Sequence, residues 1–250
     1  MKTVVLVLST HSPSFVPLIE TIKGTWAAVR VEGVDVLFYY GGDRLAIQGR
    51  DLYLPVADDL PNAGRRTLAC FEHLLDTVDF DLIFRTNCST YIDLPNLRRY
   101  VEEHAEPSRF YAGKGAFVDG IDFATGTGYF LSRDLVDLVV SRREDWDHSY
   151  LDDVALAKLL RSHGIERRPV PRVVYERARD VRKVDVSQFH FRCKTAPTGS
   201  PSRAGDVAVM LRVHEAFERA RSHSSTEARS ARNRAASLAG RAFHRLTRLQ

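Results

Sequence analysis

Short apolar runs alternate along this chain with longer segments in which apolar residues recur at helical spacing. The short runs are typical of buried strands and occur at Thr3–Leu8, Val34–Tyr40, Leu52–Leu54, Leu82–Phe84, Arg109–Ala112 and Val170–Tyr175. Helices are expected between them, over residues 14–29, over 63–78, from Leu94, from Ser132, and from Asp152 to the C-terminal cap at Gly164. This alternation predicts an α/β fold, in which a mostly parallel sheet carries helices on both faces.

The composition adds a second region to this picture. With 250 residues and 44% hydrophobic content, the chain is long enough for one domain of ordinary size and a tail. Thr, Pro, Gly and Ser dominate between about Thr195 and Gly205, which indicates a linker. We therefore expect a domain over residues 1–195, a linker over 196–206, and a basic helical extension over 207–250.

The positive charge belongs to this extension. The chain carries a net charge of +4, but residues 201–250 contain ten Arg and four Asp or Glu, which gives +6 there and −2 elsewhere. Phe217 and Phe243 are the only aromatic residues in that segment, and this argues against specific nucleic-acid binding. The tail either contacts an anionic membrane surface, and so brings the active site to a lipid-linked acceptor, or stays solvated.

The cysteines and the N-terminal segment indicate the cellular compartment of the protein. The three cysteines are odd in number and widely spaced, so they indicate neither a disulfide framework nor a zinc site. The apolar run at Thr3–Leu8 is too short for a signal peptide and lacks a cleavage site, and no run approaches the roughly 18–20 residues that span a bilayer. We expect a cytoplasmic protein, either free or peripheral at the inner membrane face.

A polar stretch follows the apolar run Leu82–Phe84. It contains Arg85, Thr86, Asn87 and Ser89. In open α/β sheets, ligands bind outside the carboxyl ends of strands, so this stretch is a candidate site; an ordinary strand–loop–helix connection is the alternative. Asn and Ser are neutral, and a hard divalent cation prefers carboxylates, so the stretch is a poor metal site.

Two acidic residues, Asp152 and Asp153, stand at the start of a predicted helix. They either cap the helix and interact with its dipole, or one of them serves as a general base. Near the end of the folded region, alternation places His190, Arg192 and Lys194 on one side of an extended segment. A lone histidine is commonly structural, but two cations beside it make a diphosphate contact plausible.

Glycines at 126 and 128 allow close backbone approach. The segment lacks the third glycine of a dinucleotide fingerprint, and the chain has neither a Walker sequence nor a nucleophile elbow.

Several segments carry short motifs in a fixed order over residues 3–195. They are Ile22–Trp26, Phe38–Gly41, Arg66-Thr67, Arg85–Ile92 with Asn96-Leu97, Thr125–Ser132, Leu151–Val154 and Phe189-His190. These resemble, in turn, the I-R-x-T-W, F-x-x-G, K-T, K-x-D-D-D-x-Y-V with N-L, S-G-x-G-Y-x-L-S, E/D-D-V and F-H motifs of the β-1,3-glycosyltransferases. That family, glycosyltransferase family 31, includes Fringe and the β-1,3-galactosyltransferases.

The resemblance implies a GT-A fold, with a nucleotide-binding half followed by an acceptor-binding half. It implies transfer of a sugar from a nucleotide donor, in this family a UDP-sugar, to a hydroxyl of a glycan or glycolipid, with inversion. Asp153, with Asp152 second, would deprotonate the acceptor hydroxyl. The donor-binding residues would be Thr10, His11, Lys23, Arg85, Thr86, Asn87, Ser89, Arg192 and Lys194. The sugar or acceptor would be bound by Gly126, Thr127, Gly128 and Tyr129.

The chain departs from the family at the metal-binding D-x-D, where it has Asn87 and Ser89. Three outcomes are open. The enzyme is metal-independent and uses Lys23, Arg85, Arg192 or Lys194 as the counter-charge, which we favour. Alternatively, it binds Mn²⁺ or Mg²⁺ through Asp93 or His190, or it is a degenerate protein that binds nucleotides or glycans without turnover.

Overall fold

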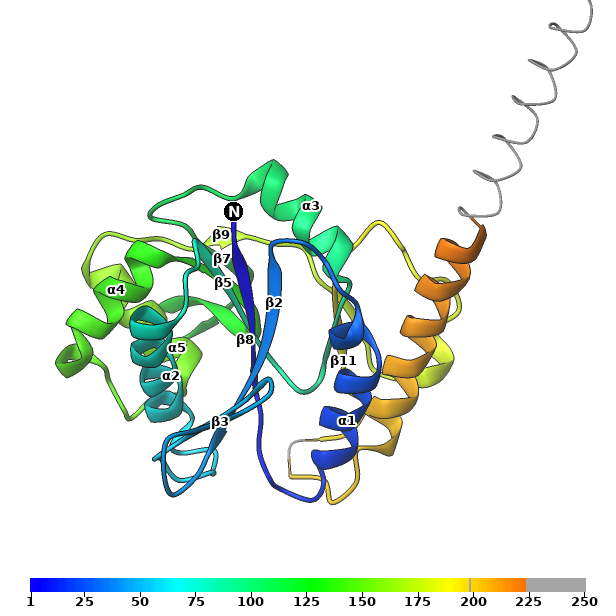
Figure 1. The fold of residues 1–250 in the computed structure, drawn as a ribbon, viewed down its shortest axis with the longest axis horizontal. Helices are drawn as coiled ribbons and strands as arrows, with labels where there is room; N and C mark the ends of the chain where they lie inside the picture. Colours follow the sequence, from blue (N-terminus) through cyan, green and yellow to red (C-terminus); the bar gives the residue numbers. More distant parts are fainter. Residues whose placement is uncertain (198, 224–250) are drawn as a thin grey trace, which may run out of the picture.

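Among the residues that the structure describes, eight strands form a mixed sheet that runs through the centre of the molecule (Figure 1). The computed structural model describes residues 1–197 and 199–223. Across the sheet lie β3 (Ala46–Gln48), β4 (Asp51–Leu54), β2 (Val34–Gly41), β1 (Thr3–Leu8), β5 (Leu82–Asn87), β8 (Ile121–Ser132), β7 (Tyr111–Val118) and β9 (Arg168–Pro169). The neighbours β4, β2, β1 and β5 are parallel, whereas β8 is antiparallel to both β5 and β7.

Helices cover both faces of this sheet and enclose two apolar clusters (Figure 1). One face carries α1 (Val16–Gly24), α3 (Leu94–His104) and a helix over residues 204–223. The other carries α2 (Ala63–Thr77), α4 (Arg133–Ser141) and α5 (Asp152–Ser162). Leu82 and Phe84 point into the first cluster and Ile83 into the second, which explains why this strand is continuously apolar. The predicted α/β fold with helices on both faces is confirmed.

The prediction of a loop directly after Phe84 is wrong. Strand β5 continues to Asn87, and after a short turn the chain enters a further strand, β6 (Thr90–Ile92). Strand β6 belongs to a second sheet with β11 (His190–Cys193) and β10 (Val173–Tyr175). Polar residues can occupy the end of β5 because their groups are hydrogen-bonded inside the protein; Arg85 is only 1% exposed.

The segment from Gly126 to Leu131 lies wholly within β8. It pairs with β5 on one side and β7 on the other. Gly128 permits this close packing, since a Cβ there would stand 2.5 Å from the Phe84 ring and 2.6 Å from the His190 ring. Ser132 directly precedes α4, which was expected to begin there. Its hydroxyl donates to Asp134 and accepts from the Phe110 N–H at 3.0 Å, so it caps no backbone N–H of the helix.

The helix over residues 204–223 begins inside the segment that was expected to be a linker. Its residues Val209, Met210, Val213 and Phe217 are buried in the same cluster as α1 and α3. This helix therefore packs as part of the main body. The expected continuation of a basic helix over residues 224–250, and with it most of the proposed membrane contact, lies outside the described residues. None of the helices in the described part of the chain has the length and apolar composition needed to cross a bilayer.

Candidate functional site

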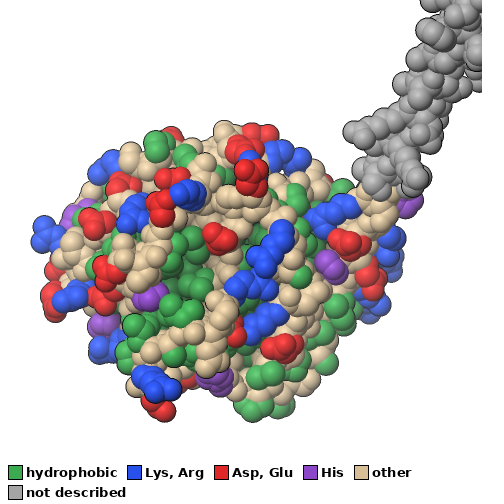
Figure 2. All heavy atoms as spheres, in the orientation of Figure 1, with side chains coloured by type: hydrophobic (Ala, Val, Ile, Leu, Met, Phe, Trp, Pro, Cys, Tyr) green, Lys and Arg blue, Asp and Glu red, His purple; other side chains and the backbone are tan. Residues whose placement is uncertain are grey.

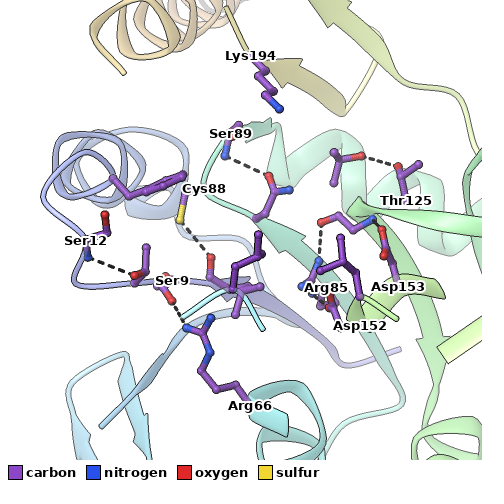
Figure 3. A pocket seen from close by; sticks show the side chains of 18 of the residues that line it. Ser9, Ser12, Arg66, Arg85, Cys88, Ser89, Thr125, Asp152, Asp153 and Lys194 are labelled. Carbon is purple, nitrogen blue, oxygen red and sulfur yellow. Dashed lines mark hydrogen bonds and ion pairs between the residues drawn. The ribbon is translucent and has the colours of Figure 1, made fainter. Parts of the chain in front are cut away.

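A cleft of about 850 Å³ opens where β1 and β5 end (Figure 3). The backbone after β1 contributes Ser9 and Thr10 to its wall, and the turn after β5 contributes Asn87 and Ser89. The start of α5 and the end of β11 supply charged residues to other parts of the wall. The cleft therefore lies at the carboxyl ends of two adjacent parallel strands, the usual ligand-binding position in open α/β sheets.

Asp153 faces this cleft from the first turn of α5. Its Oδ2 accepts a hydrogen bond from the backbone N–H of Gly126 at 2.7 Å, which fixes the carboxylate against β8. Burial, followed by the nearby charge of Asp152, raises the pKa of Asp153 above its usual value. A carboxylate with a raised pKa is a stronger base than an exposed one, so Asp153 is suited to accept a proton.

Asp152 lines the same cleft but is tied into the protein. It forms a buried ion pair with Arg85, and the hydroxyl of Thr67 donates to it at 3.3 Å. Arg85 also donates from Nε to the Tyr39 hydroxyl at 3.1 Å and from Nη1 to the Gly126 carbonyl at 2.6 Å. Because all three guanidinium nitrogens of Arg85 are engaged within the protein, this residue positions Asp152 and Gly126. Figure 3 shows Arg85, Asp152 and Asp153 together on one side of the pocket.

A basic wall faces the same cleft from the second sheet. It consists of Arg172, immediately before β10, Arg192 on β11, and Lys194 just after β11. Figure 3 shows Lys194 pointing into the pocket from a different side than Asp152 and Asp153. Figure 2 shows Lys and Arg side chains gathered near the middle of one face of the molecule, next to a patch of hydrophobic side chains.

The loop between β1 and α1 is held by Asp58, a residue that the sequence analysis missed. Asp58 accepts hydrogen bonds from the Thr10 hydroxyl at 3.0 Å and from the His11 backbone N–H at 2.6 Å, and it pairs with Arg66 at 2.6 Å. Thr10 lines the cleft, whereas the His11 ring stacks on Tyr40 with the ring centroids 5.0 Å apart. An aspartate in a loop has no sequence signature, so its partners could be identified only in the folded chain.

The other predicted residues divide into two groups. Gly126 and Thr127 line the cleft together with Asn87, Ser89, Arg192 and Lys194. Four others do not line it: Lys23, Thr86, Gly128 and Tyr129. Lys23 pairs with Asp51 at 2.7 Å, and the Thr86 hydroxyl donates to the Thr127 carbonyl at 2.6 Å. Tyr129 is buried under Arg85, whose guanidinium carbon lies 5.7 Å from the ring centroid.

The two residues considered as metal ligands are engaged elsewhere. Asp93 caps α3 by accepting from the Asn96 N–H at 3.1 Å, and it forms an ion pair with Arg221. His190 Nε2 lies 3.1 Å from the Thr127 carbonyl, and burial together with the charge of Arg172 lowers the pKa of His190 to about 3. The Asn87 side-chain carbonyl accepts from the Ser89 N–H and the Thr90 hydroxyl.

Within residues 1–197 and 199–223, no group of three or more His, Cys, Asp or Glu is placed to hold a metal ion. At the end of β5 the cleft presents the neutral Asn87 and Ser89, where a cation would require carboxylates. The nearby carboxylates Asp58 and Asp152 are paired with Arg66 and Arg85. The residues of this site therefore do not fit Mn²⁺ or Mg²⁺.

Comparisons with known proteins yield structural neighbours alone. No protein-family model matches the chain, and no curated protein matches it. One neighbour is a glycosyltransferase involved in the glycosylation of the major capsid of PBCV-1. It is 10% identical to this chain, the match covers 84% of this chain and 99% of the neighbour, and the TM-score is 0.49. The mannosyltransferase PcManGT from Pyrobaculum calidifontis, solved with GDP-Man and Mn²⁺, is 12% identical, covers 68% of this chain and 55% of its own, and has a TM-score of 0.43.

A third neighbour, A197 from STIV, is 11% identical, covers 68% of this chain and 82% of its own, and has a TM-score of 0.39. Two of these three neighbours are thus described as glycosyltransferases. The identities are too low for the likeness to say anything of this chain's activity, and none of the three supports family 31 in particular.

Proposed function

We propose that this protein is a glycosyltransferase that moves a sugar from a nucleoside diphosphate donor to a hydroxyl of a glycan or glycolipid acceptor. The observation that carries the proposal is one cleft that holds a half-buried carboxylate with a raised pKa and a basic wall on different sides. Transfer from such a donor needs a base for the incoming hydroxyl and positive charge for the leaving diphosphate. The cleft contains both.

Asp153 is the base in this proposal. It reaches the cleft while its Oδ2 is held by Gly126, so the carboxylate is oriented before the acceptor binds. Asp152 is the weaker candidate because its carboxylate is paired with Arg85 and Thr67. In a single displacement the base and the leaving group lie on opposite faces of the sugar, which makes the reaction inverting. The ordered motifs that resemble family 31 favour UDP as the nucleotide, and the PcManGT neighbour makes GDP the alternative to test.

The test measures release of the nucleoside diphosphate from UDP-glucose, UDP-galactose, UDP-N-acetylglucosamine and GDP-mannose, with and without glycan acceptors. We expect the Asp153→Asn variant to lose about 10²–10⁴-fold in turnover and to retain donor affinity, since only the base is removed. Below the raised pKa of Asp153 the base is protonated, so turnover of the parent should fall as the pH drops through that value.

Asp137→Asn, an exposed change on α4, is the matched control and should leave release unchanged. Full turnover by Asp153→Asn would contradict the assignment of the base. Nucleotide binding by the parent without any release would favour the alternative of a degenerate binding protein, and no nucleotide binding at all would overturn both.

A further inference from the structure

We propose that Arg172, Arg192 and Lys194 form a subsite for the diphosphate group of the donor and supply the positive charge that a divalent cation would otherwise provide. This inference rests on the proposed function and specifies how the same cleft holds its substrate. Arg172 was not singled out in the sequence, because one arginine before a short strand has no distinctive pattern.

The fold brings these three residues together from separate parts of the chain. Strands β10 and β11 are parallel neighbours, and Val174 of β10 stands opposite Arg192 of β11. Arg172 lies just before β10 and Lys194 just after β11, and all three side chains line the cleft. The second sheet therefore presents a cluster of positive charge next to the end of β5.

Two nitrogens of this cluster are buried without a hydrogen-bond partner. They are Nε of Arg172 and Nη1 of Arg192. Arg172 uses its Nη1 to donate to the hydroxyls of Thr125, at 2.9 Å, and Thr127, both of which are neutral. A buried guanidinium nitrogen without an acceptor is unfavourable, and most such groups in proteins are satisfied. These nitrogens therefore indicate that an acceptor from a ligand completes the site.

Asp206 is a carboxylate that acts on Arg192 and Lys194, and it is shared with other groups. Its Oδ2 accepts from Arg203 at 3.1 Å and its Oδ1 accepts from the N–H and the hydroxyl of Thr195. Burial, with the charge of Arg192, lowers the pKa of Arg172 to about 10, and burial together with Arg192 and Arg203 lowers that of Lys194. Neighbouring positive charges thus disfavour the charged forms of Arg172 and Lys194, and a bound anion would relieve this repulsion.

The chemistry of the cluster matches a diphosphate. A guanidinium group can donate two parallel hydrogen bonds to phosphate oxygens, and an ammonium group binds phosphate as a point charge. Two arginines and one lysine can thus neutralise the charges of two adjoining phosphates. The neutral Asn87 and Ser89 at the end of β5 are compatible with this arrangement, because neither carries a carboxylate that would compete with the ligand for the cations.

The test is calorimetric titration of the full chain with inorganic pyrophosphate and with UDP, in EDTA and in MnCl₂. We expect both ligands to bind in EDTA, without gain from Mn²⁺, and with affinity that falls as salt is added. Arg172→Gln and Arg192→Gln should each weaken binding about tenfold or more, as expected for loss of a charge-assisted contact. Arg182→Gln, which removes an exposed arginine that does not line the cleft, should bind like the parent.

Lys194→Gln provides a second, less buried substitution in case an arginine variant fails to fold, and stabilisation by pyrophosphate in thermal unfolding provides a second measurement. Binding only with Mn²⁺, or parental affinity in the arginine and lysine variants, would overturn the proposal. Metal-free, arginine-dependent pyrophosphate binding without any sugar transfer would support the subsite and refute the transferase. Sugar transfer that Arg172→Gln and Arg192→Gln leave unchanged would refute the subsite and support the transferase.

Discussion

At the scale of residues, a single buried arginine connects strand β5 to the candidate catalytic aspartates. Arg85 sits near the end of β5 with its side chain 2% exposed, and it pairs with Asp152, whose side chain is 8% exposed. Desolvating two charges is costly, so the pair is tolerated only because Tyr39, Thr67 and Gly126 satisfy their remaining polar atoms. Such a pair is sensitive to the loss of either partner.

Arg85→Met is predicted to lower the free energy of unfolding by about 3–5 kcal/mol, because it leaves the Asp152 carboxylate buried without its partner. Urea unfolding measures this change. The matched control is Arg143→Met, which breaks an exposed pair with Glu72 and should leave the unfolding midpoint nearly unchanged. Equal effects of the two variants would show that burial of the Arg85–Asp152 pair has no special importance.

At the scale of elements, strand β8 connects the core to the cleft through its glycines. A Cβ at Gly126 would stand 2.5 Å from Arg85 Nη1 and 3.3 Å from Asp153 Oδ2. The guanidinium group of Arg85 is fixed by its ion pair with Asp152, so it cannot move aside without breaking that pair. Gly126 is therefore required for the positions of both the arginine and the proposed base.

Gly126→Ala should keep the protein folded and reduce turnover about 10²-fold, since small displacements of a catalytic group are costly. Release of the nucleoside diphosphate measures turnover, and urea unfolding measures stability. Gly24→Ala, in α1, meets no atom within 4 Å and serves as the control with parental turnover. If Gly126→Ala turned over at the parental rate, Asp153 would not depend on its contact with β8.

The sequence identified those elements whose residues are uniformly apolar or carry clear end signals. Strand β1 was predicted to the residue, and α2 to within one residue, because the spacing of their buried apolar residues is a local property. The extension of β5 through Arg85 and the strand β6 were missed, because polar residues there are satisfied by partners distant in sequence, such as Thr127. Pattern alone cannot distinguish such a residue from a solvated loop.

Part of the candidate site was likewise predicted from the sequence, and the residues that were missed depend on partners distant in sequence. Asp153, Arg192 and Lys194 occur in ordered motifs or alternating segments, and the structure places them in one cleft. Arg172 and Asp58 have no sequence signal, because their roles depend on the pairing of β10 with β11 and on the loop after β1. His11 and Lys23 lie near the expected region, but neighbouring side chains, Tyr40 and Asp51 respectively, hold them away from the cleft.

At the scale of the whole molecule, the C-terminal helix over residues 204–223 completes one of the two apolar clusters. Phe217, which is 3% exposed, stacks on Tyr91 of β6 with the ring centroids 5.6 Å apart. On the same helix, Leu211 is 42% exposed to solvent. Strand β6 pairs with β11, which carries Arg192, so the packing of this helix supports the basic wall of the cleft.

Phe217→Ala is predicted to lower the free energy of unfolding of the whole domain by about 3–5 kcal/mol, because it opens a cavity in the shared core. Leu211→Ala, on the exposed face of the same helix, is the matched control and should change stability little. Urea unfolding followed by both circular dichroism and tryptophan fluorescence measures the effect, since Trp26 and Trp146 are buried in the two different clusters. A helix that packs as part of the body shifts both signals together, whereas a separate extension would leave the tryptophan transition of Phe217→Ala at the parental urea concentration.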